Sequence, residues 1–173
     1  MINYAHRGAS DYAPENTLSS FYLGLLQGAN GIETDIQKTK DGVLVLFHDS
    51  TVDRISNGKG QVCDFTLAEL KELEIYGNST CGFYDRIITL EEFLDKFAAY
   101  DIQFAIELKG PGVEEGTLRM IEKYGILEKT TFTSFKFDYI KKIKELNPFF
   151  TISIHQNSFT DSNTSGPQVF YYK

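Results

Sequence analysis

The 173-residue sequence predicts an α/β fold built around a parallel sheet, on the basis of two observations. Short apolar runs alternate with segments whose apolar residues recur at helical spacing, as they do in β-α-β units. The length and a hydrophobic content of 42% fit one core of ordinary size. We therefore expect residues 1–173 to form a single domain.

The first predicted elements flank a polar segment. Residues 2–5 form an apolar run that predicts a strand, and this run leads into His6-Arg7-Gly8. A helix is expected at 17–28, where apolar residues stand at helical spacing. Strands are expected next at 31–37 and, after an Asp41-Gly42 turn signal, at 43–47.

The middle of the chain interrupts this alternation. Residues 50–88 contain an Asn57-Gly58 turn, a predicted helix at 66–73 and a loop rich in Gly, Asn and Ser, and they predict a small excursion over one end of the fold. The alternation then resumes with helices at 89–100, 113–124 and 137–146 and strands at 103–108, 131–135 and 149–154. Six strands are thus expected, and residues 169–172 allow one further short strand.

The composition excludes several classes of protein. Seventeen basic and 24 acidic residues give a net charge of −7, which disfavours a nucleic-acid partner. The two cysteines are too few for a disulfide framework or a zinc site. No leader pattern or long apolar run is present, so we expect a cytoplasmic protein without stable membrane insertion.

Charged residues gather where the predicted strands end. Residues two apart in a strand face the same side, so Glu33 projects with Asp35, and Glu107 with Lys109. If these strands belong to a barrel, these side chains and two histidines, His6 and His48, meet at its carboxyl-terminal mouth. Three carboxylates forced together resist ionising unless a cation lies between them, and all-oxygen ligation favours Mg²⁺ or Ca²⁺. Because an imidazole titrates near pH 6.5, the pair of histidines fits general acid and base catalysis of phosphoryl transfer.

The sequence resembles the glycerophosphodiester phosphodiesterase family over about residues 2–154. The resemblance is carried by five ordered blocks: His6-Arg7-Gly8-Ala9-Ser10, Pro14-Glu15-Asn16-Thr17, Gly31-Ile32-Glu33-Thr34-Asp35, Phe47-His48-Asp49 and Ile106-Glu107-Leu108-Lys109. The order and spacing of these blocks are much more specific than any single block.

The resemblance implies a TIM (β/α)₈-type barrel that hydrolyses glycerophosphodiesters, such as glycerophosphocholine, to glycerol 3-phosphate and an alcohol. It implies that Glu33, Asp35 and Glu107 bind one divalent cation, Mg²⁺ or Ca²⁺. It further implies that His6 and His48 are the general acid and base, and that Arg7 and Lys109 hold the phosphate.

The sequence also departs from the family pattern. A barrel of this type takes roughly 250 residues, whereas this chain stops after about six strands and has no Trp. The barrel is therefore expected to be truncated, with its first and sixth strands as open edges. We expect either a truncated product or a chain whose polar tail and a partner subunit in a homo-oligomer cover these edges.

Two alternative functions stay open at this point. One is an inactive relative that binds the cation and phosphate without turnover, and the other is a phospholipase-D-like lyase that yields a cyclic phosphate. Two residues of the second block, Glu15 and Asn16, are expected to cap the helix that begins near Thr17 and are left outside the site. His155 matches no block and is expected to have no functional role.

Overall fold

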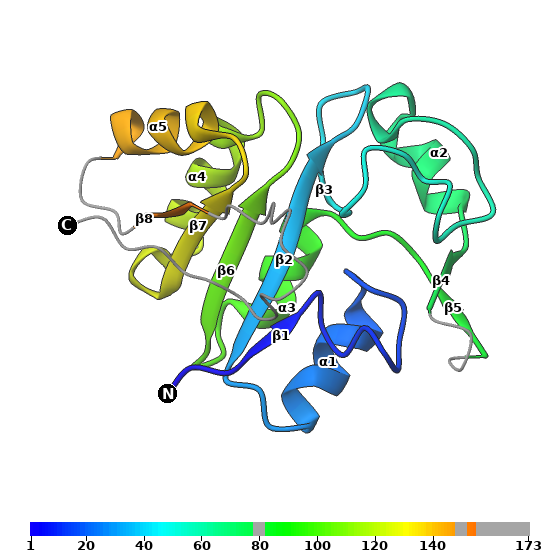
Figure 1. The fold of residues 1–173 in the computed structure, drawn as a ribbon, viewed down its shortest axis with the longest axis horizontal. Coiled ribbons are helices and arrows are strands. Elements are labelled where there is room, and N and C mark those ends of the chain that lie inside the picture. Colours follow the sequence, from blue (N-terminus) through cyan, green and yellow to red (C-terminus); the bar gives the residue numbers. More distant parts are fainter. Residues whose placement is uncertain (78–81, 148–151, 155–173) are drawn as a thin grey trace, which may run out of the picture.

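A six-stranded sheet forms the centre of the computed structural model, which describes residues 1–77, 82–147 and 152–154 (Figure 1). Its parallel strands follow the order β1-β2-β6-β7-β8, and β3 pairs with β2 in the antiparallel direction. The bounds of these strands are β1 Tyr4–His6, β2 Gly31–Lys38, β3 Leu44–Leu46, β6 Gln103–Leu108, β7 Thr130–Ser134 and β8 Ile152–Ile154. All six strands expected from the sequence are thus observed.

The described helices begin and end within a few residues of their predicted bounds. They are α1 Leu18–Leu26, α2 Leu67–Glu72, α3 Leu90–Phe97, α4 Glu114–Lys123 and α5 Phe137–Leu146, with short 3-10 helices η1 Val62–Asp64 and η2 Leu127–Lys129. A threonine caps each of the first three helices, and its side chain accepts a hydrogen bond from the backbone N–H three residues later. None of the helices in the described part is long and apolar enough to cross a membrane.

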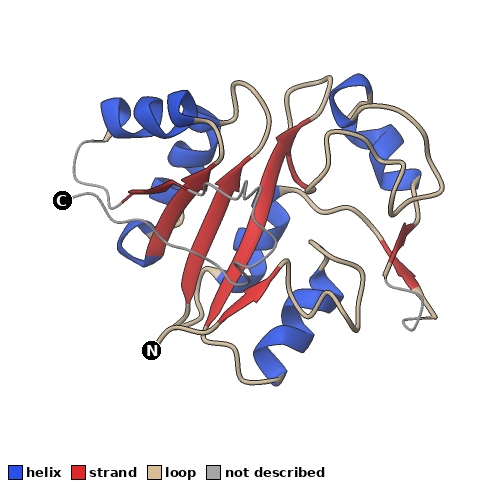
Figure 2. Ribbon diagram, in the orientation of Figure 1, coloured by secondary structure: helices blue, strands red, loops and turns tan. Residues whose placement is uncertain are grey.

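The main core lies between the sheet and the helices drawn around it in Figure 2. Alternate residues of β2 and β6, such as Ile32, Ile36 and Phe104, are fully buried and pack among aromatic side chains of α1 and α3. Because side chains alternate across a strand, the intervening residues of β2 and β6 point to the opposite face. Those intervening residues include the acidic side chains on which the predicted site depends.

The predicted excursion at 50–88 has its own apolar cluster. Its elements are η1, α2 and a separate two-stranded sheet of β4 Ile75–Tyr76 and β5 Tyr84–Asp85. Val52, Ile55, Leu70 and Ile75 are buried together there with Phe47, which follows β3. The excursion is therefore packed onto the segment that carries His48.

The third strand is an exception to the parallel sheet expected from the sequence, which assigned no direction to residues 43–47. β3 is antiparallel to β2, with Ile36 paired to Leu46. The connection from Lys38 to Leu44 is too short for a parallel crossover, which needs about a dozen residues or more. The hairpin instead returns the chain along β2, where the Phe47 N–H donates to the Asp35 carbonyl at 3.0 Å.

Two strand predictions fall wholly or partly outside the described residues. Of the strand expected at 149–154, the structure describes β8, while 149–151 and the possible strand at 169–172 lie outside the described ranges.

The single-domain organisation stays a prediction.

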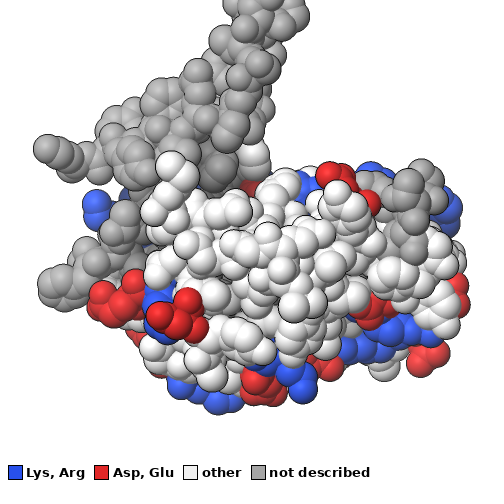
Figure 3. All heavy atoms as spheres, turned by 90° about the horizontal axis from the view of Figure 1, so that it is seen from below, with Lys and Arg blue, Asp and Glu red and all other residues white. Residues whose placement is uncertain are grey.

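The parallel strands all point the same way, so their carboxyl ends share one edge of the sheet (Figure 1). Seen from the side on which these strands begin, the surface is largely free of charged residues, which gather along its rim (Figure 3). The chemistry predicted from charged side chains therefore belongs to the other end of the strands.

The turn after β1 depends on glycine at position 8. Gly8 has φ +81°, and a Cβ there would lie 2.4 Å from Ser20 Oγ. We predict that Gly8→Ala lowers the free energy of unfolding by about 3 kcal/mol, since it combines a left-handed alanine with overpacking. Chemical denaturation measures this loss.

The matched control for this substitution is Gly28→Ala. Gly28 has φ +94° but nothing within 4 Å of a Cβ, so its replacement should cost only about 1 kcal/mol. Equal losses for the two variants would contradict the argument that Ser20 excludes a side chain at position 8.

Candidate active site

The strand register brings three carboxylates together. Asp35 on β2 pairs with Glu107 on β6, and Glu33 stands one pleat earlier on β2, opposite His6 on β1. One carboxylate oxygen from each of Glu33, Asp35 and Glu107 lies within 4.8 Å of the other two. The prediction that these side chains share one face and one site is therefore matched by the geometry.

Burial and mutual repulsion make this cluster unfavourable when it is fully ionised. Burial, followed by the charges of Asp35 and Glu107, raises the pKa of Glu33 to about 8. Burial and the charge of Asp35 raise the pKa of Glu107 to about 7, against the opposing effect of Lys109. Asp35 itself is completely buried, and its Oδ1 accepts no hydrogen bond from the described residues.

Two cationic side chains border the carboxylates. Lys109 Nζ donates to Glu107 Oε1 at 3.0 Å and lies 3.7 Å from Asp35 Oδ1. Arg7 Nε lies 3.3 Å from Asp35 Oδ2, and the Arg7 backbone N–H donates to Glu33 Oε2 at 3.1 Å. Arg7 and Lys109 thus lie beside different oxygens of Asp35, and their positive charges partly offset the acidic cluster.

Each of the two predicted histidines lies beside a carboxylate. His6 Nε2 lies 3.7 Å from Glu33 Oε2, and His48 Nδ1 lies 2.6 Å from Asp49 Oδ1. Partial loss of hydration and then the charge of Arg7 lower the pKa of His6 below 6.5, and the charge of His48 adds to this effect.

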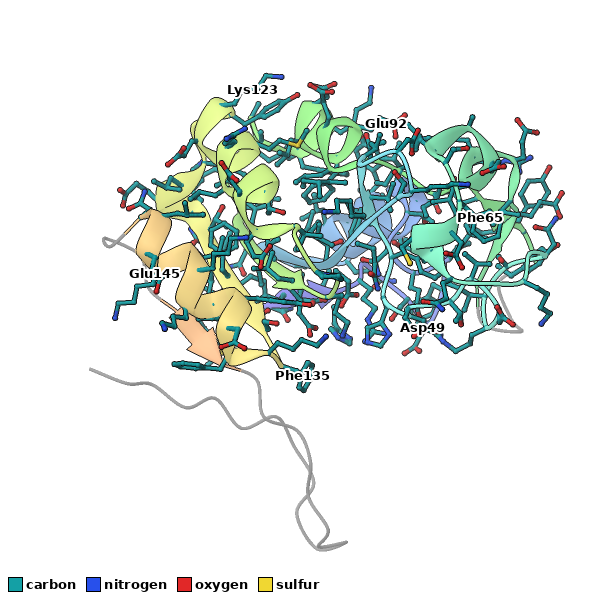
Figure 4. The ribbon with its side chains drawn as sticks, turned by 90° about the horizontal axis from the view of Figure 1, so that it is seen from above. Asp49, Phe65, Glu92, Lys123, Phe135 and Glu145 are labelled. Atoms are coloured by element: carbon teal, nitrogen blue, oxygen red, sulfur yellow. The ribbon has the colours of Figure 1, made fainter. Side chains whose placement is uncertain are left out.

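The side chains of the site lie on the face of the sheet that α3 and α4 leave uncovered. In Figure 4 the labelled Asp49 and Phe135 lie on one side of the molecule, and Glu92 on α3 and Lys123 on α4 lie on the other. The Lys109 ammonium lies 5.1 Å from the centre of the Phe135 ring, which follows β7. The acidic cluster and its cations therefore share the side of Asp49.

Residues 6–171 match the Glycerophosphoryl diester phosphodiesterase family. The chain belongs to this family. The match confirms the resemblance found in the sequence and extends beyond residue 154, where that resemblance was expected to end.

Known members of the family are similar to this chain in sequence and in fold. A glycerophosphodiester phosphodiesterase of Caldanaerobacter subterraneus subsp. tengcongensis is 40% identical over 158 residues, which are 87% of this chain and 64% of the relative. The chain thus spans less than two thirds of that relative. The crystal structure of glycerophosphodiester phosphodiesterase from Agrobacterium tumefaciens superposes with a TM-score of 0.80 at 31% identity, covering 88% of this chain and 66% of that one.

A second similar structure contains a bound product. It is a phosphodiesterase of Oleispira antarctica in complex with the product sn-glycerol-3-phosphate, and it superposes with a TM-score of 0.76 at 30% identity over 94% of this chain and 68% of that one. Together these likenesses confirm the α/β, TIM-type barrel class predicted from the sequence.

The role expected for Asn16 is wrong. Thr17, not Asn16 or Glu15, caps α1. Asn16 has φ +57° and is buried, and its Nδ2 donates to Asp35 Oδ2 at 2.9 Å while its Oδ1 accepts from Thr34 Oγ1 at 2.7 Å. Asparagine tolerates the left-handed backbone better than most residues. An asparagine just before a helix could therefore have indicated a left-handed residue at position 16. Asn16 therefore contacts the carboxylate cluster through Asp35 instead of capping the helix.

The raised pKa values predict an unusual pH dependence of stability when no divalent cation is present. Between pH 4.5 and about 8, native Glu33 keeps a proton that the unfolded chain has lost, so the free energy of unfolding falls as pH rises. We expect a loss on the order of 3 kcal/mol from pH 5 to pH 8, measured by urea denaturation in EDTA. Glu33→Gln should remove the share of the pH dependence that Glu33 causes and leave the share caused by the raised pKa of Glu107.

The control for this prediction is Glu145→Gln, which replaces an exposed carboxylate on α5. This variant should keep the pH dependence of the unmodified chain. Parallel stability curves for the Glu33→Gln variant and the unmodified chain would contradict the prediction.

Proposed function

We propose that this chain hydrolyses glycerophosphodiesters, such as glycerophosphocholine, to glycerol 3-phosphate and an alcohol, with one divalent cation. The observation that carries the proposal is the buried cluster of Glu33, Asp35 and Glu107 beside His6 and His48. Family membership and the product named in the Oleispira antarctica structure support the same substrate class.

The three carboxylates fit a hard divalent cation. They supply only oxygen atoms, and Asp35 Oδ1 is buried without a hydrogen bond from any residue that the structure describes, which leaves this atom able to bind an ion. Glu33, Asp35 and Glu107 would hold the ion, which we propose is Mg²⁺ or Ca²⁺. When bound, such an ion supplies a Lewis acid for the phosphoryl oxygens and offsets the repulsion within the cluster.

The histidines would move the protons. Burial raises the pKa of Asp49, but hydrogen bonds from Arg54 and His48 outweigh this effect and lower it. Asp49 is therefore a carboxylate that accepts a hydrogen bond from His48 Nδ1. That hydrogen bond leaves His48 Nε2 available for proton transfer. His6, with its lowered pKa, is mostly neutral at pH 7 and can accept a proton. One imidazole would take the proton of the glycerol hydroxyl that attacks phosphorus, and the other would protonate the departing alcohol. Water would then open the resulting cyclic phosphate to give glycerol 3-phosphate.

The two cations would bind the phosphate. Arg7 and Lys109 directly follow β1 and β6, and each has a donor atom close to Asp35. A guanidinium and an ammonium at these positions are suited to phosphate oxygens and to the charge that develops on them during the displacement.

Choline release from glycerophosphocholine tests the proposed function. The full chain with Mg²⁺ or Ca²⁺ should release choline, and phosphorus NMR should show glycerol 3-phosphate. His6→Ala and His48→Ala should each reduce the rate by about 10²–10⁴-fold, since each removes a proton-transfer group. Lys123→Ala, which removes a cation on the distant outer side of α4, should leave the rate unchanged.

Other outcomes of this experiment identify the alternative functions. A cyclic phosphate as the final product would indicate the phospholipase-D-like lyase. A cation-dependent rise in melting temperature without turnover under either metal would indicate an inactive relative that only binds cation and phosphate.

The role of Asn16 gives a separate prediction about cation affinity. Asn16→Gly keeps the left-handed backbone but removes the amide that holds Asp35. We expect the affinity for Mg²⁺ to fall by roughly 10–100-fold, measured by calorimetry, as is usual when a partner of a ligand is removed. Unchanged affinity would show that Asp35 is oriented without this amide.

Three expectations from the sequence remain proposals. The acidic charge of −7 supports the absence of a nucleic-acid partner, and the exposed, free Cys63 is compatible with the proposed cytoplasmic location. Light scattering coupled to size exclusion would test the proposed homo-oligomer.

A further inference from the structure

Arg54 joins two acidic side chains that come from different parts of the chain. Its Nε donates to Asp49 Oδ2 at 2.6 Å, and its Nη1 and Nη2 donate to Glu15 Oε2 and Oε1 at 3.1 and 2.6 Å. Three donors of one guanidinium thus bind two carboxylates, of which Glu15 is 11% and Asp49 25% exposed. Only the planar fork of arginine can make this pair of contacts at once.

Each carboxylate also contacts a residue of the proposed site. Glu15 Oε1 lies 3.5 Å from Arg7 Nη1, and Asp49 Oδ1 lies 2.6 Å from His48 Nδ1. A continuous series of ion pairs therefore runs from Arg7 through Glu15, Arg54 and Asp49 to His48. It connects the segment after β1 with the segment after β3.

His48 needs such support because no regular element holds it. β3 ends at Leu46, and no helix or longer strand follows until η1 at Val62. The backbone near His48 is held from β2 by Gln37 Nε2, which donates to the Asp49 carbonyl at 3.0 Å. The imidazole orientation, in contrast, depends on the Asp49 side chain, and Asp49 is held in turn by Arg54.

We propose that Arg54 is a positioning residue, which fixes Asp49 and thereby the orientation and the Nδ1–H tautomer of His48 relative to Arg7. The proposal rests on the proposed function in that it assigns Arg54 a part in the reaction of the same site. Arg54 is half-exposed and touches none of the three clustered carboxylates, so its effect on His48 is transmitted through Asp49, while Glu15 holds the guanidinium in place.

Two substitutions in the full chain test the proposal kinetically. Arg54→Lys keeps the positive charge but cannot bridge both carboxylates, and Arg54→Met removes charge and donors. Both should reduce kcat by about 10–100-fold while KM stays within about twofold, because substrate contacts remain and proton transfer is misaligned. Lys59→Met, in the same segment but paired with the exposed Asp53, is the control and should have unchanged kinetics.

A double-mutant cycle tests whether Arg54 acts through Asp49. Asp49→Asn alone should reduce kcat, and adding Arg54→Met to it should cause little further loss. Additive losses would overturn the proposed route through Asp49, and a wild-type kcat for the Arg54→Lys variant would overturn the need for the bridging geometry.

A measurement without turnover separates this proposal from the proposed function. In histidine-labelled protein, NMR should show a downfield His48 Nδ1–H signal, assigned by its loss in His48→Gln. Arg54→Lys should broaden or shift this signal, and Lys59→Met should leave it unchanged. An unaltered signal in the Arg54→Lys variant would overturn the proposal even if the chain hydrolyses its substrate, and an altered one would support it even if no hydrolysis occurs.

Discussion

The repulsion among three buried carboxylates is the constraint on which the rest of the site depends. Glu33, Asp35 and Glu107 are brought together by backbone pairing, not by attraction, and the pKa values of both glutamates rise as a result. Arg7, Lys109 and Asn16 each contact a member of the cluster and stabilise it in part. A bound cation would complete this compensation, which is why binding and stability are expected to be linked in this family member.

Apolar packing on the opposite face of the sheet offsets the unfavourable energy of the acidic cluster. Ile32, Ile36, Phe104 and Ile106 are completely buried against the helices. Fully burying side chains of this size stabilises the fold by about 1.5–3 kcal/mol each. The same pleat that buries these residues fixes the direction of their acidic neighbours, so core packing and site geometry are two consequences of one alternation.

The sequence predicted the strands, the helices and the clustering of the carboxylates, because these depend on short-range periodicity and on register at one end of a parallel sheet. It did not predict the direction of β3, although the short connection across Asp41-Gly42 already excluded a parallel crossover. The parts played by Asn16, Glu15 and Arg54 depend on side chains meeting across segments far apart in the chain. No local sequence pattern predicts such contacts between distant segments. A polar residue next to the start of a helix is equally compatible with a helix cap.

The hairpin of β2 and β3 also affects the order in which the site forms. Glu33, Asp35 and His48 lie within one short stretch joined by a tight turn, so bringing them together costs little chain entropy. Glu107 joins only when β6 pairs with β2 across a much longer intervening segment, which closes slowly. During synthesis on the ribosome, two of the three clustered carboxylates can therefore be in place well before the third has emerged.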